Sequence, residues 1–188
     1  RRQALRRALL VLSFIAFPIT IFYFSPFLII QGSYAGIITG SFLVFCALFA
    51  GSLLFGRLWC GWLCSAGALQ DALGEVNPRR VGTRVRPGKW VIWVPWLGAI
   101  VAGAISAGGY KTVDPFFGTV GGISVAGDAD FPILAAYIIY FSVVLVFFAL
   151  AAVLGRRGGC HALCWMAPFM ILGRRLRNTL GAWPSLRL

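Results

Sequence analysis

Charged residues are scarce in this chain of 188 residues. They make up 12% of the sequence, against about 25% in a soluble domain, and only five of them are acidic. Hydrophobic residues make up 60%, which is more apolar surface than one small core can hide from water. The shortage of charge therefore excludes an ordinary soluble domain and predicts an integral membrane protein covered by lipid.

The small number of acidic side chains leaves a net charge of +12. Such a charge can indicate binding to nucleic acid, but here the Lys and Arg residues flank long apolar runs. Basic residues in that position set the orientation of membrane-spanning segments. We therefore expect the chain to meet membrane lipid and to bind no nucleic acid.

Four apolar segments are long enough to cross a bilayer core, which needs roughly 20 helical residues. Helices are expected because each backbone polar group must find its partner inside its own segment. Pro18 should kink the first segment. The segments are residues 8–30, 35–55, 90–107 and 131–154, and they predict an all-α membrane protein with a single membrane domain over residues 1–188.

The basic residues are distributed unevenly over the connections between these segments. Sixteen of the seventeen lie before the first segment, between the second and third, or after the fourth. The two other connections contain only Lys111, together with Asp114, Asp128 and Asp130. Because cytoplasmic connections carry the excess of Lys and Arg, both termini are predicted to be cytoplasmic.

Two short stretches, RLWCGWLC at residues 57–64 and RGGCHALC at residues 157–164, match at a constant offset of one hundred residues. Each follows an even-numbered span, so both are predicted to lie on the cytoplasmic face. The correspondence indicates two pseudo-repeated hairpins of two spans each. The matching residues are Arg57, Cys60, Leu63 and Cys64 in the first copy and Arg157, Cys160, Leu163 and Cys164 in the second.

The spacing of the cysteines points to a shared centre. Residues four apart lie on one face of a helix, so the thiols of a pair point the same way if the span continues past the membrane surface. If the hairpins pack about a pseudo-twofold axis, four thiols converge. Four thiolates are the ligand set of a [2Fe–2S] or [4Fe–4S] cluster, or of a structural zinc. Arg57 and Arg157 would favour thiolate and offset the negative charge of such a centre.

Other roles for the cysteines are open. Structural disulfides are not expected on the cytoplasmic side, where thiols are kept reduced. Reversible thiol–disulfide exchange is possible only if the helix distorts, so that the two sulfurs of a pair can approach bonding distance. If the cysteines merely pack, the match between the two pairs in spacing and position would be a coincidence. Cys46, in the middle of a span, is expected to be inert. His161 is not expected to be an essential ligand, because Gly61 occupies the equivalent position.

The connection between the third and fourth segments reads GGYKTVDPFFGTVGG, residues 108–122. Its Asp-Pro pair and its glycines predict a structured loop. Asp114 lies at the centre of this loop. A carboxylate near the membrane interface can help to release protons from a quinol, which makes Asp114 a candidate for the quinol side. The alternative is a turn-forming aspartate before proline.

The segment GRLWCGWLCSAGALQD closely resembles the Cys-x-x-x-Cys-Pro motif of NapH/NosR-type membrane-bound iron–sulfur proteins. CHALCWMAP resembles the second copy of that motif, and VDPFFGTV resembles the loop between their third and fourth spans. Ser65 and Trp165 stand where the family usually has proline. The resemblance implies a quinol-linked electron-transfer component of the bacterial inner membrane. Family members usually carry a ferredoxin-like domain with two [4Fe–4S] clusters after the last span, and residues 1–188 contain no such segment.

Residues and resemblance together predict a membrane redox subunit that transfers electrons between the quinone pool and an iron–sulfur or thiol acceptor of a respiratory-type complex. The expected cofactor is an iron–sulfur cluster, in this chain or in a further segment or partner, with quinone as redox partner and other redox subunits as protein partners. The alternative is a membrane factor that handles metal or thiols while a redox enzyme matures. The metal or redox ligands would be Cys60, Cys64, Cys160 and Cys164.

Overall fold

The computed structural model describes residues 2–56, 58–74, 77–79, 81–82, 87–126 and 132–179. Arg57, for which an electrostatic role is predicted, lies outside these ranges. Helices dominate the described chain. In order, the elements are α1 (Arg2–Ile15), α2 (Phe17–Thr20), the 3-10 helix η1 (Ile21–Phe24), α3 (Pro26–Ala35), β1 (Ile37–Thr39), α4 (Gly40–Phe55), α5 (Leu58–Trp62), α6 (Ser65–Leu73), α7 (Gly88–Ser106), β2 (Thr112–Asp114), α8 (Ile133–Leu154), α9 (Gly158–Ala162) and α10 (Ala167–Thr179).

The first predicted span is not one continuous helix. Pro18 lies in the first turn of α2, and the axis bends by 58° between α1 and the segment Phe17–Phe24. Proline favours such a break because it has no N–H to donate to the preceding turn. The chain turns again at Ser25, whose hydroxyl accepts a hydrogen bond from the backbone N–H of Leu28 and so caps α3. The segment 8–30 is thus divided among four short elements.

The later predicted spans differ in length. The second, α4, has 16 residues, because Thr39 caps it and the residues before Thr39 form a strand. The third and fourth, α7 and α8, have 19 and 22 residues and are long and apolar enough to cross a membrane. Counting the bent N-terminal pair as one span gives three within the described residues. The four-span topology and the cytoplasmic termini remain predictions.

A small parallel sheet departs from the all-α prediction. Strands β1 and β2 pair in parallel, with Thr39 opposite Asp114. The backbone N–H of Lys111 donates to the carbonyl of Gly36, 2.8 Å away, and so extends the pairing. The strands occupy two connections between helices, where backbone groups lack intrahelical partners and satisfy each other instead.

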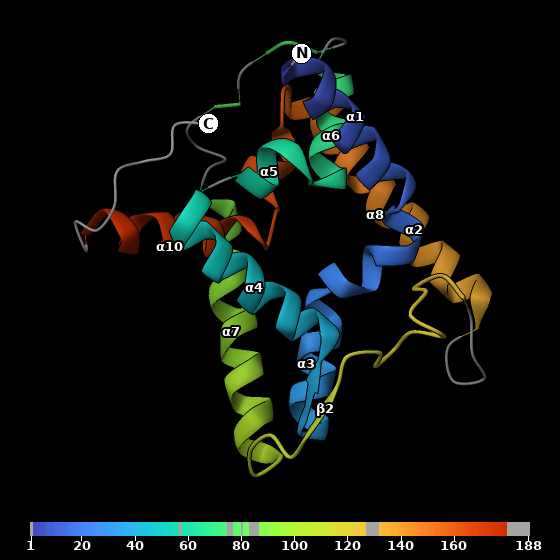
Figure 1. Cartoon of the computed structure of the whole chain (residues 1–188), viewed down its shortest axis with the longest axis vertical. Helices are drawn as coiled ribbons and strands as arrows, with labels where there is room; N and C mark the ends of the chain where they lie inside the picture. Colours follow the sequence, from blue (N-terminus) through green and yellow to red (C-terminus); the bar gives the residue numbers. More distant parts are fainter. Residues whose placement is uncertain are drawn as a thin grey trace.

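The helices form two arms that meet where α5, α6 and α9 lie (Figure 1). In one arm α3 and α4 pack with α7 and α10. In the other arm α1 packs on α6, and α6 packs on α8. The helix that follows the first cysteine pair, α6, thus packs on α8 of the second half. The helix that follows the second pair, α10, packs on α4 of the first half. This reciprocal exchange is the three-dimensional counterpart of the sequence repeat.

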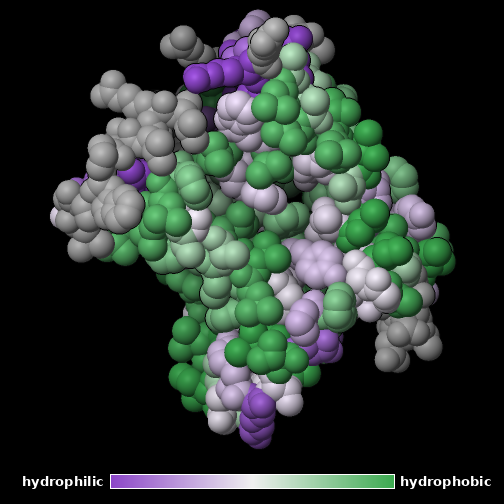
Figure 2. Space-filling model, in the orientation of Figure 1, coloured by the Kyte–Doolittle hydropathy of each residue, from purple (hydrophilic) through white to green (hydrophobic). Residues whose placement is uncertain are grey.

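Much of the surface is apolar. Figure 2 shows hydrophobic residues over most of the visible face, with hydrophilic residues gathered at the end where the N-terminus lies. In α8 the buried residues are Ala136, Phe147 and Ala151, so most side chains of this very apolar helix face outward. An outward apolar face on a helix of this length is what a bilayer requires.

Candidate metal centre

Both cysteine pairs lie on short helices that are separate from the preceding spans. The span α4 ends at Gly56 and α8 ends at Gly155, and both glycines have positive φ, 66° and 89°. Gly155 also lies against the backbone of Arg79, where an added Cβ would come within 2.4 Å of the carbonyl oxygen. The condition under which the two thiols of a pair would point the same way, that each span continues through its cysteine pair, is therefore not met, since the chain turns before each motif.

Each pair is divided between a short helix and the start of the next helix. Cys60 lies within α5 and Cys160 within α9. Cys64 is the residue that precedes α6, and Cys164 lies between α9 and α10. The second cysteine of each pair thus stands near a helix N-terminus, where unpaired backbone N–H groups stabilise negative charge.

The two halves bring the second cysteine of each pair to one cavity of about 90 Å³. Cys64 and Cys164 both line it, and the tryptophan beside each pair, Trp59 or Trp165, lines it too. Trp165 is fixed by a 2.9 Å hydrogen bond from its indole N–H to the carbonyl of Phe24. Cysteines one hundred residues apart in sequence therefore share one apolar chamber.

The pKa values of the thiols also indicate that the two cysteine pairs lie close together. The pKa of the Cys64 thiol is raised to about 12, mainly by burial, with smaller contributions from the nearby Cys160 and Cys60 and an opposing contribution from the amides of Gly67 and Ala66. Burial also raises the pKa of the Cys164 thiol, and the other three cysteines add to that shift. Thiols this hard to ionise become thiolates when a metal supplies positive charge.

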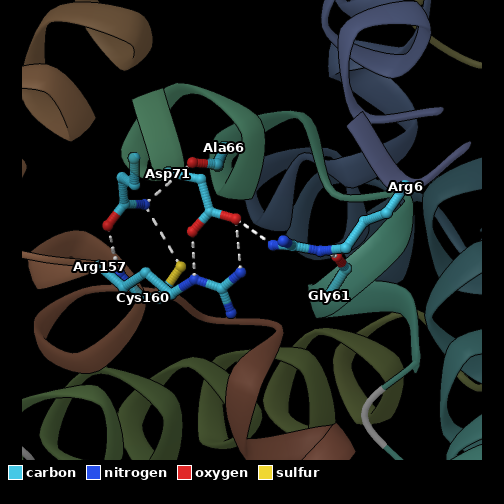
Figure 3. Close-up of polar contacts among 7 residues, drawn as sticks. Arg6, Gly61, Ala66, Asp71, Arg157 and Cys160 are labelled. Carbon is cyan, nitrogen blue, oxygen red and sulfur yellow. Dashed lines mark hydrogen bonds and ion pairs between the residues drawn. The ribbon is translucent and has the colours of Figure 1, made fainter. Parts of the chain in front are cut away.

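Arg157 lies beside the cysteines but is held by a carboxylate that the sequence did not single out. Its guanidinium donates to Asp71 of α6 at 2.7 and 2.9 Å, and Arg6 of α1 pairs with the same carboxylate (Figure 3). Hydrogen bonding to Asp71 is the main cause that raises the pKa of Arg157, and Cys160 and Cys60 also contribute. Arg157 therefore faces both Asp71 and the thiols.

Gln70, the neighbour of Asp71, is a second residue that sequence reasoning missed. Its side chain is completely buried. Its amide nitrogen donates to the sulfur of Cys160 at 3.3 Å and to the carbonyl of Ala66 at 3.1 Å. Its amide oxygen accepts from the backbone N–H of Cys160 at 3.2 Å. The adjacent polar residues Gln70 and Asp71, between apolar residues in the stretch ALQDAL, are the signal that the sequence offered.

Three other residues were considered from the sequence: Asp114, Cys46 and His161. Asp114 ends β2, at the opposite end of the molecule from α5 and α6 (Figure 1). Its carboxylate accepts from the backbone N–H of Phe116 at 3.0 Å, as a turn-forming aspartate does. Cys46 is exposed on α4. His161 lies in the last turn of α9, between the cysteines of the second pair.

Within the described ranges, no three His, Cys, Asp or Glu side chains are placed to hold one metal ion. In a multi-iron cluster each thiolate binds a different iron, so its ligands stand further apart than those of a single ion. Cys64 and Cys164 line one apolar chamber, and Cys60 and Cys160 lie near enough to raise the pKa of both thiols. These four cysteines are therefore the residues that could hold a cluster.

Residues 37–84 match a family model described as a 4Fe-4S binding domain. The matched segment runs from β1 through α6 and contains Cys46, Cys60 and Cys64. This match supports an iron–sulfur family. It also supports an iron–sulfur cluster as the cofactor and suggests a role in electron transfer. No curated protein and no solved structure matches the chain significantly.

Proposed function

We propose that the chain is a membrane redox subunit that holds a [4Fe–4S] cluster between its two halves, with Cys60, Cys64, Cys160 and Cys164 as ligands. The observation that supports this most directly is the shared chamber: Cys64 and Cys164, from corresponding positions of the repeat, line the same cavity. A bound [4Fe–4S] cluster supplies one-electron transfer at a potential set by its surroundings.

The surroundings of the thiols suit a negatively charged centre. Asp71 carries one negative charge and pairs with two arginines, Arg6 and Arg157, so the three residues together leave one positive charge close to the cysteines. The starts of α6 and α10 add backbone N–H groups, because helix N-termini attract negative charge. Apolar and aromatic side chains around the chamber keep water out, which strengthens both effects.

We further propose that the partner in electron transfer is the quinone pool of a bacterial inner membrane, as in the NapH/NosR-type proteins that the motifs resemble. The chamber that reaches Cys64 and Cys164 is also lined by Ile139, Val143 and Phe147 of the apolar helix α8. A hydrophobic redox molecule in the bilayer would thus approach the thiols along α8. Asp114 lies at the opposite end of the molecule, so it is given no part in taking up protons from a quinol at this chamber. In this proposal other redox subunits complete the complex.

The test is to purify the chain anaerobically in detergent and to record its iron content with its visible and electron paramagnetic resonance spectra. We expect about four iron atoms per chain and a signal that appears on reduction. Cys64→Ser and Cys164→Ser should each abolish the signal, because one centre needs ligands from both halves. Cys46→Ser is the matched control and should leave iron content unchanged, since Cys46 is exposed on α4.

Several results would contradict the proposal or part of it. Zinc or copper in place of iron, or thiols that titrate as two disulfides, would favour a factor that handles metal or thiols during maturation of a redox enzyme. Loss of half the iron in each single variant would indicate two separate sites, one for each pair. Added quinol should reduce the iron centre in the wild-type chain, and no reduction would exclude the quinone pool as the direct partner.

A further inference from the structure

The surroundings of the two cysteine pairs are unlike at one position. Gln70 of α6 and Met170 of α10 are equivalent in the repeat, at the same offset of one hundred residues, and both are buried, with exposed fractions of 0% and 2%. Methionine has no hydrogen-bond donor in its side chain, whereas glutamine has two N–H groups and an acceptor oxygen. The repeat is therefore broken where α6 reaches the second cysteine pair.

Gln70 contacts Cys160 at two points. Its amide oxygen accepts the backbone N–H of Cys160, and its amide nitrogen donates to the sulfur of the same residue. The second N–H of this amide points to the carbonyl of Ala66 in the same helix, one turn earlier. Figure 3 shows Ala66 and Cys160, the two residues that these bonds reach.

These partners fix which end of the amide is nitrogen. If the amide were turned over, its oxygen would face the Ala66 carbonyl and its nitrogen would face the backbone N–H of Cys160. Two acceptors and two donors would then oppose each other in a buried place, which is costly. The neighbouring Gly159 leaves room for the contact, because a Cβ there would lie 3.3 Å from the amide nitrogen and 2.7 Å from Phe147.

We propose that Gln70 is a positioning residue that fixes Cys160 and donates a hydrogen bond to its sulfur, so that the two cysteine pairs present unlike ligands to the iron–sulfur centre. This inference rests on the proposed function for its redox consequence. An N–H group directed at a ligand sulfur stabilises the more negative, reduced state and raises the reduction potential. The Cys60 side, where Met170 is the equivalent of Gln70, lacks this amide.

Three variants separate the donor from mere packing. Gln70→Leu keeps the approximate volume and removes both polar contacts. Gln70→Glu keeps an oxygen that accepts the Cys160 N–H but, as a carboxylate, has no proton to donate to sulfur. Met170→Leu is the matched control, because it changes the equivalent buried position of the other half without removing a donor.

The first measurement needs no cluster. The full chain, freed of metal and reduced, is alkylated with iodoacetamide, and the rate at each cysteine is read from its peptide by mass spectrometry. Loss of a hydrogen bond to a charged group should lower the fraction of thiol that is ionised by about tenfold. The remaining thiolate is more nucleophilic because it is less stabilised, so the net effect of losing the bond is alkylation that is about threefold slower. Gln70→Leu should show this loss at Cys160 and not at Cys60, and Met170→Leu should show it at neither.

The second measurement is an anaerobic redox titration of the iron-loaded chain followed by electron paramagnetic resonance. Gln70→Leu should move the midpoint to a more negative potential, and Gln70→Glu should move it further because it adds a negative charge. Met170→Leu should leave it at the wild-type value. A Gln70→Leu chain with wild-type potential and wild-type alkylation at Cys160 would overturn the inference, even if its thermal stability fell. A wild-type chain that takes up no iron would overturn the proposed function instead, and the alkylation rates would still decide whether Gln70 donates to Cys160.

Discussion

The carboxylate of Asp71 accepts two hydrogen bonds from the guanidinium of Arg157, at 2.7 and 2.9 Å, although the residues lie 86 positions apart in the sequence. Arg6 pairs with the same carboxylate and also donates to the carbonyl of Gly61 at 2.8 Å. One side chain on α6 thus connects the first helix of the chain to the loop that enters the second cysteine pair. The contact fixes the relative position of the two halves beside the cysteine pairs.

Removal of the Asp71 carboxylate should destabilise the protein. Asp71→Asn leaves two arginines close together without their counter-charge. The three side chains are partly exposed, at 18–30%, so solvent screens the loss, and we expect about 1–2 kcal/mol, less than for a fully buried pair. Thermal unfolding in detergent measures it. Asp114→Asn is the control, because Asp114 is exposed and its carboxylate accepts a hydrogen bond from the backbone N–H of Phe116 in its own turn. An equal loss in both variants would contradict the role given to Asp71.

The stability that Asp71 provides should depend on pH. Burial raises the pKa of Asp71, but the bonds and charges of Arg157 and Arg6 outweigh burial, and the net shift is downward. A carboxyl group with a lowered pKa in the folded state stabilises above its unfolded pKa of about 3.9, and the stabilisation is lost as the pH falls through the folded value. The melting temperatures of the wild-type chain and Asp71→Asn should therefore converge below about pH 4. A constant difference from pH 6 to pH 3 would show that the charge is not the source.

The contact between α10 and α4 should not tolerate a larger residue at Gly173. A Cβ at that position would lie 1.8 Å from the hydroxyl oxygen of Ser52 and 3.1 Å from its Cβ. Gly173→Ala should cost about 1–3 kcal/mol, and Ser52→Ala in the same chain should restore part of it by removing the closest atom. Gly61→Ala is the control, since nothing lies within 4 Å of the added carbon. If Gly173→Ala is as stable as Gly61→Ala, the close approach of the two helices is wrong.

The predicted topology can be tested with fusion reporters. A green fluorescent protein joined after Leu188 should fluoresce, because it folds in the cytoplasm, and alkaline phosphatase inserted at Lys111 should be active, because it folds outside. These expectations follow from the distribution of sixteen of the seventeen basic residues on one side. The opposite pattern would place the cysteine pairs on the periplasmic side, where disulfides form readily.

The sequence was informative where a pattern repeats or where an apolar run is long. The offset of one hundred residues located both cysteine pairs, and α7 and α8 lie close to the predicted segments 90–107 and 131–154. It was least informative where local and tertiary effects compete. Pro18 predicted a kink, yet the extent of the break through η1 to α3 also depends on contacts such as the one from the N–H of Phe22 to the Ser124 hydroxyl.

The polar residues around the centre were missed for a related reason. Gln70 and Asp71 lie in a helix that looks like an ordinary cytoplasmic connection, and their partners Cys160 and Arg157 are 90 and 86 residues away. The local sequence of a single chain carries no sign of such a pairing. This pairing arises because α6 packs on the second half and α10 packs on the first half. The repeat alone predicted a pseudo-twofold axis between the halves but not this exchange of helices.

The exchange of α6 and α10 between the halves also determines when, during synthesis, the two cysteine pairs can come together. Chains emerge from the ribosome N-terminus first, so Cys60 and Cys64 are made, and α6 with them, well before α8 exists to receive it. The ligand set stays incomplete until α9 and α10 have been translated and have reached the first half. If the four cysteines hold one cluster, as we propose, iron must be delivered to a polypeptide that already includes α9 and α10, and a chain truncated before α9 would enter the membrane without acquiring its metal.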